Sequence, residues 1–254
     1  MLLNQLLKNI FCVYRPWIRN SDVMPLEAAK EGATGYSFPS GHTQIASAEF
    51  LSIAYWQKKR TYLVITCVLL TLLVMFTRMY LGVHTLLDVT VSFLLSVIVL
   101  FANVKLLLWV DAGKKRDLFV LFLGLVLTAA MLAFTALKPY PSDIVDGVLL
   151  VDPAHMISDC YAAAGCASGF LLGWFLERRY LKFETNVSAK TKFGRAIFGS
   201  VVLYICAAFA KGAITSIHAY WGEFVFYCFA FLYILFIYPA IFVAVEKKFA
   251  AKRS

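Results

Sequence analysis

Long, uninterrupted apolar segments are the feature that most constrains the fold of this 254-residue chain. Hydrophobic residues make up 61% of it and charged residues 15%, whereas a soluble domain carries about 45–50% and about 25%. Only helices and closed barrels satisfy their backbone hydrogen bonds inside a bilayer. The segments are rich in Leu, Val, Phe and Ala and do not alternate with polar residues, which favours helices. The sequence therefore predicts an all-α, polytopic membrane helix bundle.

The expected bundle has one partial helix and about seven longer helices. Their predicted ranges are 1–14, 42–57, 61–82, 85–110, 117–138, 157–176, 196–217 and 224–245. The first helix would rise only about 21 Å, which is less than the roughly 30 Å hydrocarbon thickness of a bilayer. We therefore expect an N-terminal portion to be missing from this sequence.

Basic residues gather in alternate loops of this bundle. Sixteen of the 24 Lys and Arg residues fall in four segments on one side of the membrane, at 58–60, 114–116, 178–195 and 247–253. Cytoplasmic loops carry the Lys/Arg excess, so the opposite side is predicted to face the periplasm or the exterior of a plasma or inner membrane. The basic clusters thus indicate topology and predict no nucleic-acid partner. The loops 16–41, 78–85 and 139–156 are expected on the outer side.

The first candidate motif is Lys8, Arg15 and Pro16. Seven residues are close to two helical turns, so Lys8 and Arg15 are predicted to share a helix face. Pro16 is predicted to end that helix. Taken alone, two cations near a helix end are also typical of a snorkelling membrane anchor.

The second motif is the stretch 35–42, Gly-Tyr-Ser-Phe-Pro-Ser-Gly-His, which opens a helix. Pro39 and Gly41 predict a tight turn, and Ser40 is an expected N-cap. The N–H groups and the positive dipole end of a helix start together form an anion site. His42 lies in the first turn of that helix. A simple capping device is the alternative for this segment taken alone.

The third motif is Arg78, His84 and Asp88. The four-residue spacing predicts that His84 and Asp88 share a face of the helix 85–110. The carboxylate can then accept the imidazole N–H, fix the tautomer and leave the other ring nitrogen as a nucleophile. A structural His–Asp pair is the alternative.

The three motifs are predicted to meet on the outer side of the membrane, where they offer three cations, a turn of amide donors and two histidines. Phosphoryl transfer needs positioning and charge stabilisation, which this set supplies. We expect His84, oriented by Asp88, to attack phosphorus and form a phosphohistidine, with His42 as acid and then base. The expected phosphate ligands are Lys8, Arg15, Ser40, Gly41 and Arg78. Neither a metal nor another cofactor is expected, because the sequence shows no ligand cluster with metal spacing.

Lys-x6-Arg-Pro, Pro-Ser-Gly-His and Arg-x5-His-x3-Asp, in that order, resemble the type 2 phosphatidic acid phosphatase superfamily, which includes the vanadium haloperoxidases. The resemblance implies the same roles for the same residues. One departure is Thr77 before Arg78, where the family usually has Ser. The resemblance spans about residues 1–138, which we expect to form the phosphatase core. Residues 139–254 are expected to add three transmembrane helices.

The sequence thus predicts a membrane-embedded, metal-independent hydrolase of a lipid phosphate or diphosphate. Phosphatidic acid, phosphatidylglycerophosphate and undecaprenyl diphosphate all fit, and the expected partners are that lipid and the bilayer. A phosphotransferase using the same intermediate and a catalytically silent binding or transport protein are the alternatives. The stripe Gly165, Gly169 and Gly173 predicts close helix packing, within the chain or between protomers.

Overall fold

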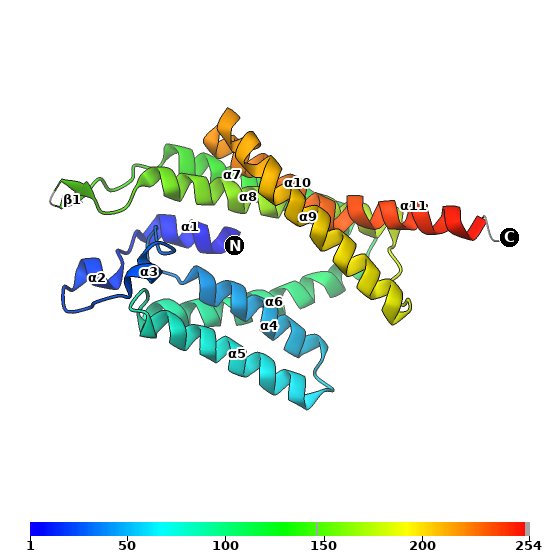
Figure 1. The fold of residues 1–254 in the computed structure, drawn as a ribbon, viewed down its shortest axis with the longest axis horizontal. Coiled ribbons are helices and arrows are strands. Elements are labelled where there is room, and N and C mark those ends of the chain that lie inside the picture. Colours follow the sequence, from blue (N-terminus) through cyan, green and yellow to red (C-terminus); the bar gives the residue numbers. More distant parts are fainter. Residues whose placement is uncertain (146, 252–254) are drawn as a thin grey trace. The chain divides into compact units, whose positions relative to one another are not determined.

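The computed structural model describes residues 1–145 and 147–251, and 77% of the chain is helical. A single short hairpin, β1 (Ile144–Val145) with β2 (Val148–Leu149), is the strand structure in this described part. Figure 1 shows the succession of helices along the chain. The predicted all-α polytopic bundle is therefore confirmed. The main helices are α1 (Leu2–Phe11), α4 (Gly41–Trp56), α5 (Thr61–Tyr80), α6 (Leu86–Asp111), α7 (Arg116–Leu137), α8 (Pro153–Leu176), α9 (Ala189–Ile217), α10 (Ala219–Leu232) and α11 (Tyr238–Ala251).

Five described helical segments are long and apolar enough to cross a membrane. They are Thr61–Tyr80, Leu86–Asp111, Arg116–Leu137, Ala189–Ser216 and Tyr220–Glu246. Most of their side chains are not covered by protein, which is the arrangement expected when lipid is the surrounding solvent. The chain is a multi-pass membrane protein.

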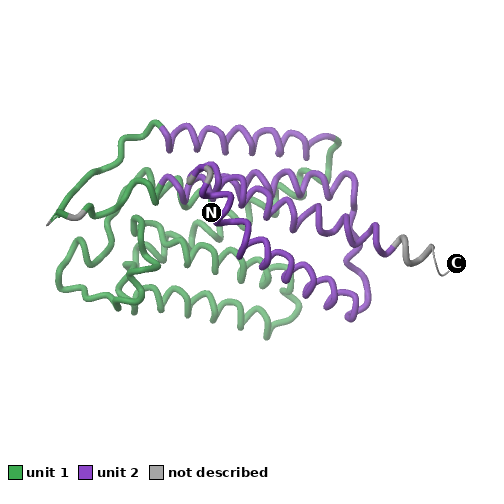
Figure 2. The backbone as a smooth tube through the Cα atoms, turned by 45° about the horizontal axis from the view of Figure 1, so that its top comes forward, with its two compact units in different colours: residues 1–114, 137–156 green, residues 115–136, 157–254 purple. Residues whose placement is uncertain are grey.

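The chain divides into two compact units (Figure 2). Unit 1 comprises residues 1–114 and 137–156, and unit 2 comprises residues 115–136 and 157–254. Almost all of α7 therefore belongs with the C-terminal helices, although the sequence grouped residues 117–138 with the catalytic core. Whether residues 1–138 form a separate catalytic core stays a prediction.

In unit 1, α4 packs against both α5 and α6. The sequence fixes where two of these helices begin. Ser40 caps α4 by accepting the N–H of Thr43, as predicted. Thr85 caps α6 in a reciprocal capping box with Asp88. As a result, the N-terminal ends of α4 and α6 lie with the C-terminal end of α5, opposite the basic loop 57–60.

The N-terminal segment differs from the predicted helix 1–14. Cys12 adopts a left-handed conformation with φ of 47° and ends α1 at Phe11. Pro16 then opens the short helix α2 (Pro16–Arg19) with Arg15 as its N-cap, because a proline fits the first helical position. The predictions that Lys8 and Arg15 share one helix face and that Pro16 ends that helix are therefore wrong.

A second correction concerns the third motif. His84 lies in the turn between α5 and α6, not on a helix face shared with Asp88. The capping box explains the difference, because it starts α6 at Leu86, two residues after His84. The turn is held by the N–H groups of Val83 and His84, which both donate to the carbonyl of Arg78 at 3.3 Å.

Unit 2 contains the glycine stripe. An added Cβ on Gly165 would lie 2.3 Å from the carbonyl oxygen of Phe224, and one on Gly169 would lie 2.1 Å from that of Cys228. The stripe therefore lets α8 and α10 approach within one chain. The π-helical segment η1 (Glu177–Leu181) extends α8. A second one, η2 (Tyr233–Ile237), joins α10 to α11 just before Pro239, which has no N–H to donate to the preceding turn.

Candidate active site

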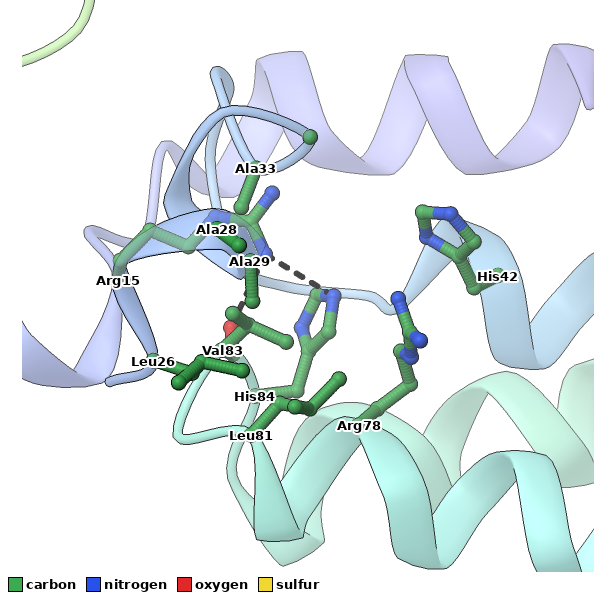
Figure 3. A pocket seen from close by; sticks show the side chains of 11 residues that line it. Arg15, Leu26, Ala28, Ala29, Ala33, His42, Arg78, Leu81, Val83 and His84 are labelled. Carbon is green, nitrogen blue, oxygen red and sulfur yellow. Dashed lines mark hydrogen bonds between the residues drawn. The ribbon is translucent and has the colours of Figure 1, made fainter.

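A cavity of about 320 Å³ lies in unit 1, where α4, α5 and α6 meet (Figure 3). One wall is apolar and comes mostly from the loop around α3 (Glu27–Lys30). The polar wall consists of Arg15, His42, Arg78 and His84. The three sequence motifs therefore do converge on one space, at the end of unit 1 predicted to face outward. The full lining is Arg15, Leu26, Ala28, Ala29, Gly32, Ala33, His42, Arg78, Leu81, Val83 and His84.

Arg15 is fixed by its neighbours. Its Nε donates to the carbonyl of Gly35 at 2.8 Å, and its Nη1 donates to the carbonyl of Val83 at 3.0 Å. The same Nη1 lies 3.0 Å from Nε2 of His84. Burial lowers the pKa of Arg15 to about 10. The negative charge of Asp88 raises this pKa, and the positive charge of Arg78 lowers it further. The guanidinium therefore remains charged near neutral pH.

The contact with Arg15 also defines the tautomer of His84. A guanidinium can only donate hydrogen bonds, so Nε2 of His84 must accept and the neutral ring carries its proton on Nδ1. Burial is the main reason that the pKa of His84 falls to about 4; Asp88 raises it, while Arg15 and Lys8 lower it further. His84 is therefore a neutral imidazole at physiological pH, with the lone pair of Nε2 on the cavity side.

The carboxylate of Asp88 is almost fully buried, with 1% of the residue exposed. Its Oδ2 accepts the backbone N–H of Thr85 at 2.7 Å and the hydroxyl of Ser37 at 2.6 Å. The distance from Oδ2 to Nδ1 of His84 is 3.5 Å, which is beyond the usual length of an N–H···O bond. Sequence reasoning found this pair but missed Ser37. The available signal was a polar residue between two aromatic residues, five positions before His42.

Arg78 brings a charged group whose Nε has no hydrogen-bond partner in the part of the chain that the structure describes. In Figure 3 its guanidinium points to the same side as the rings of His42 and His84. A buried donor of this kind is costly unless an acceptor reaches it. A phosphate oxygen is an acceptor of suitable charge.

The turn before α4 is built from backbone contacts. The amide of Ser40 donates to the carbonyl of Asp88 at 3.2 Å, and Asn4 donates to the carbonyl of Pro39 at 3.2 Å. The Phe38–Pro39 peptide bond is cis. These contacts join α1, the turn and α6, so the positions of the second and third motifs depend on each other.

Two sequence models match the chain. The model described as the PAP2 superfamily matches residues 1–111, and the model described as PAP2 superfamily phosphatase, transmembrane extension, matches residues 161–252. The chain belongs to the PAP2 superfamily. It is a membrane phosphatase of that superfamily. Searches of curated proteins and of solved structures gave no significant match.

The PAP2 motif residues divide into two groups by their place around the cavity. Arg15, His42, Arg78 and His84 line it. The remaining four stand outside this lining: Lys8, Ser40, Gly41 and Asp88.

Three of these four residues make contacts that position the candidate site. Lys8, 7% exposed, donates to the carbonyl of Tyr36 at 2.6 Å. Asp88 acts behind His84, and the hydroxyl of Ser40 serves as the helix cap. In the described residues no three His, Cys, Asp or Glu side chains gather as a metal site.

Proposed function

We propose that this PAP2 protein hydrolyses a lipid phosphate or lipid diphosphate through a phosphohistidine on His84. One observation carries the proposal: the unprotonated Nε2 of a neutral, buried imidazole faces a cavity that also holds the guanidinium groups of Arg15 and Arg78. A nucleophile and two fixed cations in one space are what transfer of a phosphoryl group requires.

In the first step, Nε2 of His84 attacks phosphorus, and the bond from phosphorus to the leaving oxygen breaks. For this attack, Nη1 of Arg15 must leave Nε2 of His84 so that the phosphorus can approach that nitrogen. Arg15 can turn that donor to a phosphate oxygen, because its Nε bond to Gly35 still holds it in position. Arg78 neutralises charge on the other oxygens, and His42 donates a proton to the leaving oxygen. Asp88 stabilises the positive charge that the ring of His84 acquires.

In the second step, water attacks phosphorus and the bond to Nε2 breaks. His42 takes the proton from that water, and inorganic phosphate and neutral His84 are released. Lys8, Ser40 and Gly41 complete the proposed phosphate site. Since these three do not line the cavity, Lys8 and the turn at Ser40–Gly41 act through the backbone they hold or after a small movement of the turn. Arginines supply the countercharge, so the proposed reaction is metal-independent.

The apolar wall of the cavity supports a lipid leaving group. This wall offers no side-chain hydrogen-bond partner, because it consists of Leu26, Ala28, Ala29, Ala33 and Gly32, and glycine has no side chain. A sugar leaving group would lose its hydrogen bonds to water against this wall. An acyl or polyprenyl chain would not. Phosphatidic acid, phosphatidylglycerophosphate and undecaprenyl diphosphate all remain candidates.

The charge distribution supports an active site that faces the periplasm or exterior of a plasma or inner membrane. The cavity lies at the end of unit 1 opposite the basic loop 57–60, and such loops are typical of the cytoplasmic side. Residues 1–138 would then carry catalysis, and residues 139–254 would add membrane helices.

The test is release of inorganic phosphate from a panel of lipid phosphates and diphosphates by the purified protein, with a chelator present. We expect activity that chelator does not remove, an acid-labile phosphoenzyme, and no activity for His84→Ala. His155→Ala, which changes an exposed histidine outside the cavity, is the matched control. Full activity in His84→Ala would refute the mechanism.

Two alternatives predict different results in the same experiment. A phosphotransferase would pass the group to an added alcohol or lipid acceptor and release less inorganic phosphate. A catalytically silent binding protein would bind the lipid without releasing phosphate. The unpartnered Nε of Arg78 is compatible with a hydrolase, a phosphotransferase and a binding protein. The lone pair of Nε2 on His84 favours the hydrolase and the phosphotransferase, because both of these pass through a phosphoenzyme.

A further inference from the structure

Ser37 is buried directly behind the proposed nucleophile. It is 1% exposed, and its backbone N–H donates to the carbonyl of Val13 at 2.7 Å. Its hydroxyl donates to Oδ2 of Asp88 at 2.6 Å and lies 3.4 Å from Nδ1 of His84. The residue therefore contacts both members of the His84–Asp88 pair.

The direction of the protons in this group follows from two fixed partners. Arg15 can only donate, so Nε2 of His84 accepts and the proton of the neutral ring is on Nδ1. Asp88 as a carboxylate can only accept, so the Ser37 hydroxyl proton points to Oδ2. The lone pairs of the Ser37 oxygen are then left for the N–H on Nδ1.

The distances show that Asp88 alone does not hold the ring. The direct separation between Nδ1 and Oδ2 is 3.5 Å, and that between Nδ1 and the Ser37 oxygen is 3.4 Å. Neither is a strong hydrogen bond, and the two acceptors share the N–H. The short bond from Ser37 to Asp88 keeps both acceptors in place.

We infer that Ser37 is a positioning residue of the proposed phosphatase reaction, which holds Asp88 and the ring of His84 in place from the Nδ1 side while Arg15 keeps the lone pair on Nε2. The inference rests on the proposed function for its kinetic consequence, but the hydrogen bonding of Nδ1 of His84 is measurable without activity. Ser37 does not line the cavity itself, so its effect must pass through His84, the lining residue that it contacts.

Kinetics provide the first test. Ser37→Ala leaves Oδ2 of Asp88 with one hydrogen bond fewer and removes one of the two acceptors of the imidazole N–H. We expect kcat to fall about 10- to 100-fold while KM changes by less than about threefold. Ser37→Thr keeps the hydroxyl and should recover most of kcat. Ser47→Ala is the matched control, because Ser47 is equally buried and its hydroxyl has no partner among the described residues.

Coupling to Asp88 distinguishes positioning from a general packing effect. In an Asp88→Asn background, Ser37→Ala should lower kcat by less than about threefold further, because its partner is already altered. Equal losses in both backgrounds would mean that Ser37 does not act through Asp88.

Nitrogen-15 NMR of the four histidines in detergent provides a readout independent of turnover. The wild-type protein should show His84 protonated on Nδ1, and in Ser37→Ala the Nδ1–H proton should shift upfield because one of its two acceptors is lost, while Arg15 keeps Nε2 unprotonated. An unchanged His84 signal together with unchanged kcat would overturn the inference. If the wild-type protein released no phosphate from any substrate, the proposed function would fail, and the NMR result would still decide the role of Ser37.

Discussion

Lowering the pH from 7 to 5 should leave most of the proposed nucleophile, His84, in its neutral form. Burial of His84, with smaller contributions from Arg15 and Lys8, lowers its pKa to about 4, whereas an unperturbed histidine titrates near 6.5. At pH 5 a group with a pKa of about 4 is roughly 90% neutral, and one with a pKa of 6.5 is roughly 3% neutral. The difference corresponds to about 30-fold in the fraction of active nucleophile.

The measurement is kcat/KM against pH, which reports the ionisation of the free enzyme and free substrate. The second ionisation of a phosphate monoester also falls near pH 6, so the substrate must be titrated separately and its contribution divided out. The remaining acid limb should have its midpoint near pH 4, because activity is lost only as His84 becomes protonated. Titration of the His84 NMR signal in the same detergent is the control.

A corrected acid limb with its midpoint near 6.5, followed by the His84 signal, would refute the reasoning. It would mean that water reaches the ring of His84 in solution, so that burial does not disfavour its charged form. A limb near 6.5 that the His84 signal does not follow would instead report the ionisation of a group other than His84.

Three further predictions test the site and the packing around it. Arg78→Ala should lower kcat by about 100-fold or more, because it removes a cation that the proposed mechanism places beside the transferred group. Arg78→Lys should recover only part, and full activity in either variant would contradict the assignment. Gly32→Leu should lower kcat/KM for a long-chain lipid phosphate much more than for a small phosphomonoester, since Gly32 lines the cavity and a Cβ at this position would meet no atom within 4 Å. An equal effect on both substrates would argue against an apolar leaving-group wall. Gly169→Ala should destabilise the protein by about 1–3 kcal/mol, because its Cβ would lie 2.1 Å from a backbone oxygen. Gly212→Ala is the control and should be neutral or stabilising, because its Cβ would have no atom within 4 Å. Equal thermal unfolding temperatures of the two variants in detergent would contradict the packing of α8 against α10.

The starts of the helices predicted at 42–57 and 85–110 followed closely from local signals. Ser40 and Thr85 mark two helix starts with side-chain caps, and the structure places them at Gly41 and Leu86. The starts predicted at 196 and 224 were less accurate, because these helices begin at Ala189 and Ala219, directly after the side-chain caps Ser188 and His218. The early end of α1 could not be seen either, since Cys12 is not a residue that favours a left-handed conformation.

Spacing along the sequence gave the right partners for the wrong reason in two motifs. Lys8 and Arg15 do not share a helix face, yet both donate to adjacent carbonyls in the second motif, at Tyr36 and Gly35. His84 is not on α6, yet its Nδ1 lies 3.5 Å from Asp88. Periodicity arguments assume a continuous helix, and both motifs cross a helix end where that assumption fails.

The sequence by itself determined that this chain spans a membrane with many helices and carries the motifs of the PAP2 superfamily. These conclusions depend on composition and on residues close together in the chain, so local patterns suffice. Only the tertiary structure decided the tautomer of His84, the separation of the motif residues into cavity-lining and supporting groups, and the place of Ser37 between His84 and Asp88. Each of these depends on contacts between residues up to 69 positions apart, and no local pattern encodes the distance between two such side chains.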